Sequence, residues 1–339
     1  MPIIWQLQMK RSKMQKHKHL LLLVALYVGL FAVSSHAARA NQAPPQATSN
    51  GYTVNTFSTQ FTPSTVDLLG LGVKGYSWYP HNYLGQKASA SKIAVDENTK
   101  TLVLNGDKDI GNSQLATVTI SKSNPDKFIG TAFGGGGYFE AELSFDPDQV
   151  ISTGPKAEWP AFYGLSVERV AQAGADHWSG QPSGYVHYIE VDFFEYGVAF
   201  NGNAKNFYGT DLHDWYGIEK STCPKFLCNY ARPRADSKSE VPKKTDFSKY
   251  HKYGFLWVPA TDTRQGLAQY YFDALPIGKP VLWNKMPDDA APTPDGKPWA
   301  FSILDKQHLI LILGTGYEQL MKVKSVNVWQ SSDDNNLKR

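Results

Sequence analysis

One nine-residue stretch, residues 188–196, constrains the fold of this chain more than any other. It reads Tyr-Ile-Glu-Val-Asp-Phe-Phe-Glu-Tyr, so three carboxylates stand inside a run of β-branched and aromatic residues. Val, Ile, Tyr and Phe are enriched in β-strands, whereas Asp and Glu are depleted there. We therefore expect a strand that buries one face in a core and presents acids on the other face.

The two faces of this strand follow from the alternation of its side chains. Alternation turns the apolar residues toward the core, namely Ile189, Val191 and Phe193. Glu190 and Asp192 then point the other way, but strict alternation would send Glu195 to the core. One extra residue at Phe193-Phe194, a β-bulge, would return Glu195 to the face of the other two acids. The sequence therefore predicts a bulge and three acids along one face.

Paired carboxylates on one face are suited to cleavage of a glycosidic bond. One acts as nucleophile and the other protonates the leaving oxygen, at ~5–5.5 Å for retention of configuration. Across the bulge, Glu190 and Glu195 stand four strand steps apart, roughly 13 Å, and two long side chains can close much of that gap. Asp192 lies between them, where its charge can push the two pKa values apart. The alternative is that these are ordinary exposed acids on the solvent face of a strand.

Further motifs along the chain resemble one family. The acid run is Glu190-Val191-Asp192-Phe193-Phe194-Glu195, and the other matching segments read Gly-Tyr-Phe-Glu-Ala at 137–141, Glu-Trp-Pro-Ala-Phe-Tyr at 158–163, Thr-Asp-Leu-His at 210–213, His-Lys-Tyr-Gly-Phe-Leu-Trp at 251–257, Tyr-Phe-Asp at 271–273 and the closing strand 321–329. Together they resemble glycoside hydrolase family 16, the secreted β-glucanases, laminarinases, agarases and carrageenases. The resemblance covers most of the chain after residue 50.

The resemblance implies an all-β fold, a two-sheet antiparallel β-sandwich (concanavalin A-like jelly roll) with a concave substrate cleft. It implies a retaining endo-acting hydrolase in which Glu190 is the nucleophile, Glu195 the acid/base and Asp192 their tuning partner. No cofactor is expected, although a structural calcium ion would be compatible with the family. A β-1,3- or mixed-linked glucan is the first substrate expected, and a galactan such as agarose the second.

The chain departs from the family pattern at three places. Glu142 stands where the family often has Arg, and Ala274 replaces the Gly of an Asp-Gly turn. Residues 308–316 lack the usual Asn and Gly-Gly. These departures weaken any assignment to one substrate branch and leave the three acids untouched.

The candidate residues that bind sugar lie around the acid strand. Trp159 is placed at the cleft by the resemblance, and Tyr188 shares the face of the acids. Trp178 and Trp215 stand in segments that we interpret as loops flanking that strand. His213 falls where the family carries a histidine near the nucleophile; the alternative is a structural hydrogen-bonding role. His187 alternates onto the core face and is read as structural, and Trp257 and Trp329 as core.

The order of segments along the chain predicts one domain behind a leader. Residues 1–40 combine a basic start, an apolar run of 14 residues at 20–33 and small-x-small cleavage sites, which is typical of a secretory signal peptide. The alternative is an uncleaved anchor. Residues 41–51 are polar and Pro-rich and are predicted to be a disordered linker. The catalytic domain is expected at 52–330, followed by a polar tail at 331–339.

The catalytic domain has the pattern of a β-protein. Runs rich in Val, Ile, Thr, Tyr and Phe alternate with turn signals, at 92–95, 101–104, 115–120, 138–145, 161–167, 186–196, 255–258, 269–272, 308–313 and 321–329. Short helical turns are expected at 168–175 and 305–308, and long loops at 171–184 and 200–250. The second loop contains both cysteines, Cys223 and Cys228, which suggest a local disulfide in a secreted protein, with two free thiols as the alternative. A metal site is not expected from two cysteines alone.

The charge balance argues against nucleic acid or an anionic membrane as partner. Six of the 34 Lys and Arg residues and none of the 31 Asp and Glu residues lie in residues 1–40. The remainder therefore carries 28 basic and 31 acidic residues, a net charge of about −3. We expect a monomer, secreted or periplasmic and free of the membrane after cleavage, that binds a polysaccharide. Two alternatives remain open: a transglycosylase that remodels a glycan, and a lectin-like binding domain without turnover.

Overall fold

The computed structural model describes ten stretches of the chain. They are residues 42–80, 92–106, 113–121, 127–154, 160–170, 185–197, 206–218, 234–288, 300–316 and 319–339. All but Gln42 belong to the second of two compact units, Ala43–Arg339. The predicted signal peptide lies outside the described residues, as do Trp159, Trp178, Cys223 and Cys228. Among the helices of the described stretches, none is long and apolar enough to cross a membrane.

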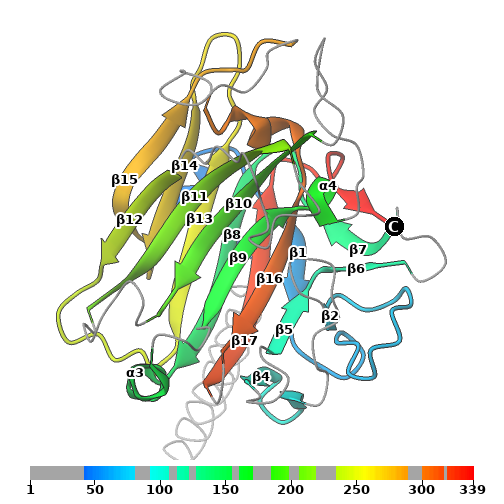
Figure 1. Cartoon of the computed structure of the whole chain (residues 1–339), viewed down its shortest axis with the longest axis vertical. Helices are drawn as coiled ribbons and strands as arrows, with labels where there is room; N and C mark the ends of the chain where they lie inside the picture. Colours follow the sequence, from blue (N-terminus) through cyan, green and yellow to red (C-terminus); the bar gives the residue numbers. More distant parts are fainter. Residues whose placement is uncertain are drawn as a thin grey trace, which may run out of the picture. The chain divides into compact units, whose positions relative to one another are not determined.

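Two antiparallel sheets form the body of the second unit (Figure 1). The eight-stranded sheet consists, in spatial order, of β15 (Leu275–Trp283), β14 (Gly266–Phe272), β13 (His251–Val258), β8 (Gly137–Phe145), β17 (Leu320–Gln330), β4 (Thr101–Asn105) and β3 (Ile93–Asp96), with β1 (Val54–Thr59) paired to β17. The seven-stranded sheet consists of β12 (Arg234–Glu240), β11 (Phe207–Ile218), β10 (Tyr185–Glu195), β9 (Ala161–Ser166), β16 (Leu309–Thr315), β5 (Ser113–Ala116) and β2 (Tyr79–Pro80).

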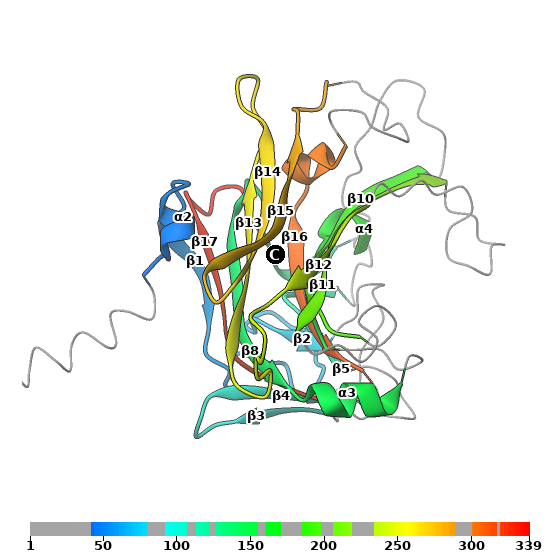
Figure 2. The ribbon, with the colours of Figure 1, turned by 90° about the vertical axis from the view of Figure 1, so that its left-hand side faces the viewer.

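Smaller elements complete the fold. A three-stranded sheet, called the small sheet below, consists of β18 (Leu337–Lys338), β7 (Phe128–Ala132) and β6 (Val118–Ile120). The helices are α2 (Pro45–Thr48), α3 (Pro147–Thr153), α4 (Val167–Val170) and the 3-10 helix η2 (Ser302–Lys306). The ribbon of β10 bends away from the eight-stranded sheet toward the upper right of Figure 2.

The core lies between the two large sheets. Phe193 of β10 packs on Phe255 of β13 with ring centroids 4.9 Å apart, and on Phe139 of β8 at 5.9 Å. Ile189, Val191 and Phe193 are each 0% exposed and belong to one cluster with residues of the other sheet. The two-sheet antiparallel sandwich and the core face of the acid strand are therefore as predicted.

The segment at 41–51 was predicted to be a disordered linker, and from residue 43 onward this prediction is wrong. Helix α2 packs on the outer face of the eight-stranded sheet, where Ala47 is 0% exposed in a cluster with Leu256 and Trp329. The Gln46 side chain donates a hydrogen bond to the Tyr138 hydroxyl at 2.8 Å. A single buried alanine provides too little apolar pattern for sequence reasoning to detect.

The polar tail predicted at 331–339 ends in a strand of the small sheet. Leu337 pairs with Ala132 in the β18–β7 ladder. The backbone of Arg339 exchanges two hydrogen bonds with Gly130, at 2.9 and 3.1 Å. Two residues of strand give no readable alternation, so the ladder was not predicted.

The prediction of a long loop at 200–250 is also wrong, because β11 and β12 lie within that range. Strand β11 pairs with the acid strand from Tyr185↔Ile218 to Glu195↔Gly209. Polar residues lie on both faces of β11 and hide its strand pattern, and two of them, Asp211 and His213, line the candidate site described next.

Candidate active site

The predicted bulge is present in β10. Against β9 the paired residues pass from Asp192↔Tyr163 to Phe194↔Phe162, and against β11 from Asp192↔Asp211 to Glu195↔Gly209. One residue of β10 is therefore extra on each side of the strand. Glu195 consequently returns to the face of Glu190 and Asp192, as the sequence predicted.

Aromatic packing accounts for the position of the bulge. Phe193 and Phe194 are both 0% exposed, so two neighbouring side chains enter the same core. Phe194 packs against Tyr253 at 4.3 Å and against Phe145 at 5.2 Å between ring centroids. Full burial of a phenylalanine stabilises by about 1.5–3 kcal/mol, which offsets the ladder hydrogen bonds that a bulge disrupts.

We call the face of the seven-stranded sheet that carries Glu190, Asp192 and Glu195 the site face. The two glutamates remain partly exposed, whereas Asp192 is 2% exposed. On β11, the residues opposite the three acids are His213, Asp211 and Gly209 in turn. The site face thus presents two accessible carboxylates with a buried carboxylate between them.

Trp215 holds the carboxylate of Glu190. Its indole Nε1–H donates a hydrogen bond of 2.8 Å to Glu190 Oε2. The indole also stacks on Tyr188, with centroids 6.1 Å apart and planes 15° apart, and the guanidinium of Arg169 lies 5.6 Å over the Tyr188 ring. Trp215 was predicted to lie in a loop, but it lies on β11, one strand from the nucleophile candidate. Tyr188 shares the site face as predicted, yet it is 6% exposed and packed between Arg169 and Trp215.

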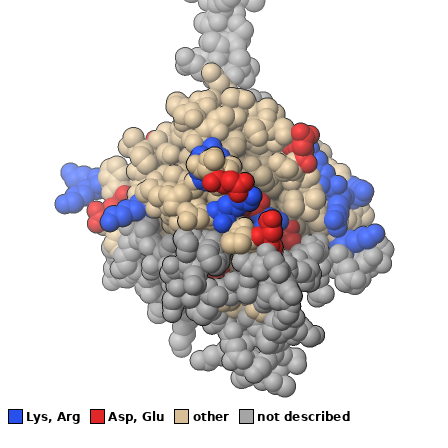
Figure 3. Space-filling view, turned by 90° about the horizontal axis from the view of Figure 1, so that it is seen from above, with Lys and Arg blue, Asp and Glu red and all other residues tan. Residues whose placement is uncertain are grey.

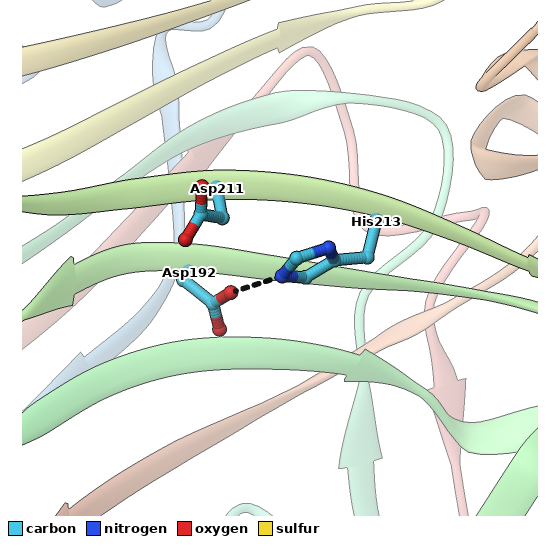
Figure 4. Close-up of side chains that lie close together, drawn as sticks. All are labelled: Asp192, Asp211 and His213. Carbon is cyan, nitrogen blue, oxygen red and sulfur yellow. Dashed lines mark ion pairs between the residues drawn. The ribbon is translucent and has the colours of Figure 1, made fainter. Parts of the chain in front are cut away.

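A buried cluster of three titratable groups occupies the middle of the site face (Figure 4). His213 Nε2 lies 3.2 Å from Asp192 Oδ2, and one ligand atom each of Asp192, Asp211 and His213 lies within 4.8 Å of the others. Two buried carboxylates this close repel each other unless a proton or a cation lies between them. The oxygen and nitrogen donors of this cluster could hold a divalent cation. They could equally share protons with one another.

Asp211 is a site residue that sequence reasoning missed. It lies opposite Asp192 in the β10–β11 register, and it is 6% exposed. The signal was present: Asp211, His213 and Trp215 stand at every second position, as the residues of one strand face do. Treating residues 200–250 as a loop concealed that alternation.

Tyr270 approaches the cluster from the other sheet. Its hydroxyl donates a hydrogen bond of 2.8 Å to the backbone carbonyl of Asp211. Burial, and then the negative charges of Asp192, Asp211 and Glu195, raise the pKa of the Tyr270 phenol well above its ordinary value. Tyr270 therefore remains a neutral hydrogen-bond donor. Part of the rise in its pKa comes from the negative charges of the site face.

Other predicted residues fall into structural positions. His187 Nε2 lies 2.6 Å from Asp214 Oδ1, and the second carboxylate oxygen of Asp214 accepts a hydrogen bond from the Phe301 backbone. His187 is 5% exposed, in agreement with the structural role expected for it. Trp257 and Trp329 are 0% and 2% exposed, so both are core residues as predicted.

The surface seen from above carries charges of both signs. In Figure 3, side chains of Lys and Arg lie beside side chains of Asp and Glu rather than in separate fields. Mixed charge of this kind gives no long-range attraction for a polyanion.

Comparison with known proteins adds likeness of structure only. No family model matches the chain, and no curated protein matches it. Among solved structures it is similar to LamA from Z. galactanivorans in complex with laminaritriose and laminaritetraose (14% identity, 82% of this chain and 100% of that chain, TM-score 0.43). It is also similar to the endo-β-1,3-glucanase from Pyrococcus furiosus (16%, 71% and 78%, TM-score 0.36) and to the calreticulin globular domain from T. cruzi (10%, 83% and 88%, TM-score 0.37). An endo-β-1,3-glucanase is thus among the structures similar to this chain. At TM-scores below 0.5, any functional conclusion has to come from the site residues themselves.

Proposed function

We propose that this protein is a glycoside hydrolase that cleaves a β-linked polysaccharide with retention of configuration. One observation carries the proposal: the bulge at Phe193–Phe194 brings Glu195 to the face of Glu190. Two partly exposed carboxylates on one face supply the nucleophile and the acid that this reaction needs.

The roles proposed for the two glutamates are those that the family resemblance of the acid run implies. Glu190 attacks the anomeric carbon, and the Trp215 N–H that it accepts fixes its orientation for that attack. Glu195 protonates the leaving oxygen and then removes a proton from the water that releases the glycosyl group. Asp192, buried between them against His213, adjusts the charge that both glutamates experience.

The test is hydrolysis of a panel of β-1,3-glucan, mixed-linked glucan, agarose and carrageenan by the wild-type chain and two variants. Glu190→Gln and Glu195→Gln should each lose activity by at least about 10³-fold, since each removes a group on which the reaction depends. Glu142→Gln is the matched control, because Glu142 lies on the other sheet and pairs with Lys324 at 2.7 Å. Wild-type activity in either site variant would rule out the assignment.

The separate roles can be resolved with an activated substrate. If Glu195 is the acid/base, azide should restore turnover of a Glu195→Ala variant, because an activated leaving group needs no proton and azide replaces water. Product carrying azide with retained configuration is expected. Azide product of retained configuration from Glu190→Ala, with inverted product from Glu195→Ala, would exchange the two roles.

We also propose that residues 1–40 direct the protein out of the cytoplasm. The basic start followed by 14 apolar residues and small-x-small sites supports export. Amino-terminal sequencing of protein recovered from culture medium or periplasm should begin at Asn41 or Ala38. Recovery of an intact leader in the membrane fraction would favour the anchor instead.

A further inference from the structure

Strand β10 loses one of its two strand partners just before Glu190. Strand β9 ends at Ser166, and its last pair with β10 is Glu190↔Leu165. Strand β10 begins at Tyr185, and over residues 185–189 it pairs with β11 alone among the described strands. The other edge of this stretch therefore needs partners from outside the ladder for its backbone groups.

The side chain of Gln307 supplies those partners. Its Nε2 donates a hydrogen bond of 2.7 Å to the carbonyl of His187, and its Oε1 accepts one of 3.2 Å from the N–H of Ile189. A carbonyl and the N–H two residues later point to the same edge of a strand, where a neighbouring strand would normally bind both. The amide of Gln307 thus takes the place of a strand at this point.

Ser166 adds a second contact at the same point. Its Oγ accepts a hydrogen bond of 3.0 Å from the Ile189 N–H, and its hydroxyl also bonds to Gln307 Oε1. Ser166 and Ile189 are 0% exposed, and Gln307 is 3% exposed. Because water does not reach these groups, the loss of one partner would leave a buried polar group unsatisfied.

Gln307 is anchored to the opposite sheet. It directly follows η2, in which the carboxylate of Asp305 accepts hydrogen bonds from Trp257 Nε1 at 2.9 Å and from Trp283 Nε1 at 2.7 Å. Trp257 lies on β13 and Trp283 on β15, both in the eight-stranded sheet. The 3-10 helix therefore connects that sheet to β10, and Gln307 is the residue that makes the connection to the β10 backbone.

We infer that Gln307 is a positioning residue for Glu190, an inference that rests on the glycosidase function proposed above. The N–H that Gln307 holds belongs to Ile189, the residue directly before Glu190. Tyr188, between the two bonded backbone groups, stacks on Trp215, and Trp215 donates to Glu190 Oε2. Gln307 therefore fixes the nucleophile candidate at its backbone and, through the two aromatic rings, at its carboxylate.

The test compares Gln307→Met with Gln319→Met. Methionine keeps the length of glutamine but loses the amide. Gln319 is the matched control, because it is 1% exposed and its Nε2 donates to Thr153 Oγ1 at 2.7 Å. The substrate is whichever glycan of the panel the wild-type chain cleaves fastest.

A misplaced nucleophile hinders the transition state more than substrate binding. In Gln307→Met, kcat should therefore fall roughly 10- to 100-fold while KM stays within about threefold of the wild-type value. Both constants should be unchanged in Gln319→Met. A wild-type kcat in Gln307→Met, or a change in KM alone, would overturn the inference and leave the glycosidase function standing.

A second readout does not depend on turnover. The indole N–H signal of Trp215 in a proton–nitrogen NMR spectrum, identified by its loss in Trp215→Phe, reports the hydrogen bond to Glu190. The signal should move in Gln307→Met and keep its wild-type position in Gln319→Met. An unmoved signal would overturn the inference. If the wild-type chain cleaves no glycan of the panel, the glycosidase function fails, and this signal alone decides whether Gln307 positions Glu190.

Ser166→Ala keeps the test decisive if Gln307→Met does not fold. It removes one of the two acceptors of the Ile189 N–H and changes the volume of the side chain very little. The Trp215 signal should move, and kcat should fall by a smaller factor than expected for Gln307→Met. Wild-type values of both in Ser166→Ala, with Gln307→Met unfolded, would make Gln307 a residue of the fold and overturn the inference.

Discussion

The site face has a half on β10 and β11 and a half on β9, β16 and β5, called the covered half because Leu165, Tyr163, Ile310 and Ile312 are at most 6% exposed. The two halves belong to one sheet and share one register, yet their side chains differ in chemistry. The row through Asp192 shows this: Asp211 lies on one side of it, and Tyr163 and Ile312 lie on the other. On β11 the row is acidic, and on β16 it is aliphatic and 0% exposed. The pairing of strands sets which residues share a face. What covers that face decides whether it becomes a site or a second core.

Ile312→Asp should have the largest effect on this contrast. The new carboxylate would be buried in the covered half, next to aliphatic residues. Burying a charge without a partner should lower the free energy of unfolding by about 3–5 kcal/mol. Urea denaturation measures the loss. Leu282→Asp is the matched control, because Leu282 is 51% exposed, and it should change stability by less than about 0.5 kcal/mol. Equal stability of both variants would mean that the covered half is open to water.

Trp215→Phe tests the other half. It removes the hydrogen bond to Glu190, and bonds to charged groups contribute about 1.5–3 kcal/mol, so kcat/KM should fall roughly 10- to 100-fold. The acidic limb of its pH profile should also move to higher pH, because the lost N–H favoured the ionised carboxylate.

Trp329→Phe is the control for that variant. Trp329 is 2% exposed and its indole N–H has no hydrogen-bond partner among the described residues, so no polar contact with them is lost. Its activity and pH profile should match the wild-type chain. If Trp215→Phe lowers kcat/KM without shifting the pH profile, Trp215 acts through packing and not through its hydrogen bond to Glu190.

Asp211→Asn should shift the pH profile in the opposite direction. Removing one of two neighbouring negative charges makes the remaining carboxylates easier to ionise. The acidic limb of kcat/KM should move to lower pH by about one unit, which corresponds to about 1.4 kcal/mol. The measurement is kcat/KM from pH 3 to 8, on the order of ten points. An unchanged limb would exclude Asp211 from the electrostatics of the site.

Arg339→Ala should have the smallest effect, a slight loss of stability of the small sheet. The guanidinium lies 4.8 Å over the Phe128 ring, and a cation–π contact of this kind contributes about 0.5–1 kcal/mol at an exposed site. Lys279→Ala, at an exposed position of β15, is the control and should leave the urea midpoint unchanged. A stability equal to wild type in Arg339→Ala would show that backbone pairing alone holds β18.

The sequence predicted the site residues that lie on β10 itself. It missed Asp211, which joins them only through the pairing of β11 with β10. The bulge, the core face and most strands of the sandwich follow from local alternation, and each is present. Asp211 was not predicted as a site residue, because the polar residues of β11 make that strand resemble a loop. In the small sheet, β6 lies within the strand predicted at 115–120, but β7 and β18 were not predicted, because strands of five and two residues carry little pattern and the pairing of Leu337 with Ala132 is long-range.

The bulge also has a consequence for how related chains can differ in length. A strand that reads acid, x, acid, x, acid places three carboxylates on one face by plain alternation, with no extra residue. Deleting Phe193 would produce that shorter pattern and keep the same four steps between the outer glutamates. Deleting Val191 would instead turn Asp192 toward the core. An indel at the paired phenylalanines is thus nearly silent for the geometry of the acids, and the same indel two residues earlier is not.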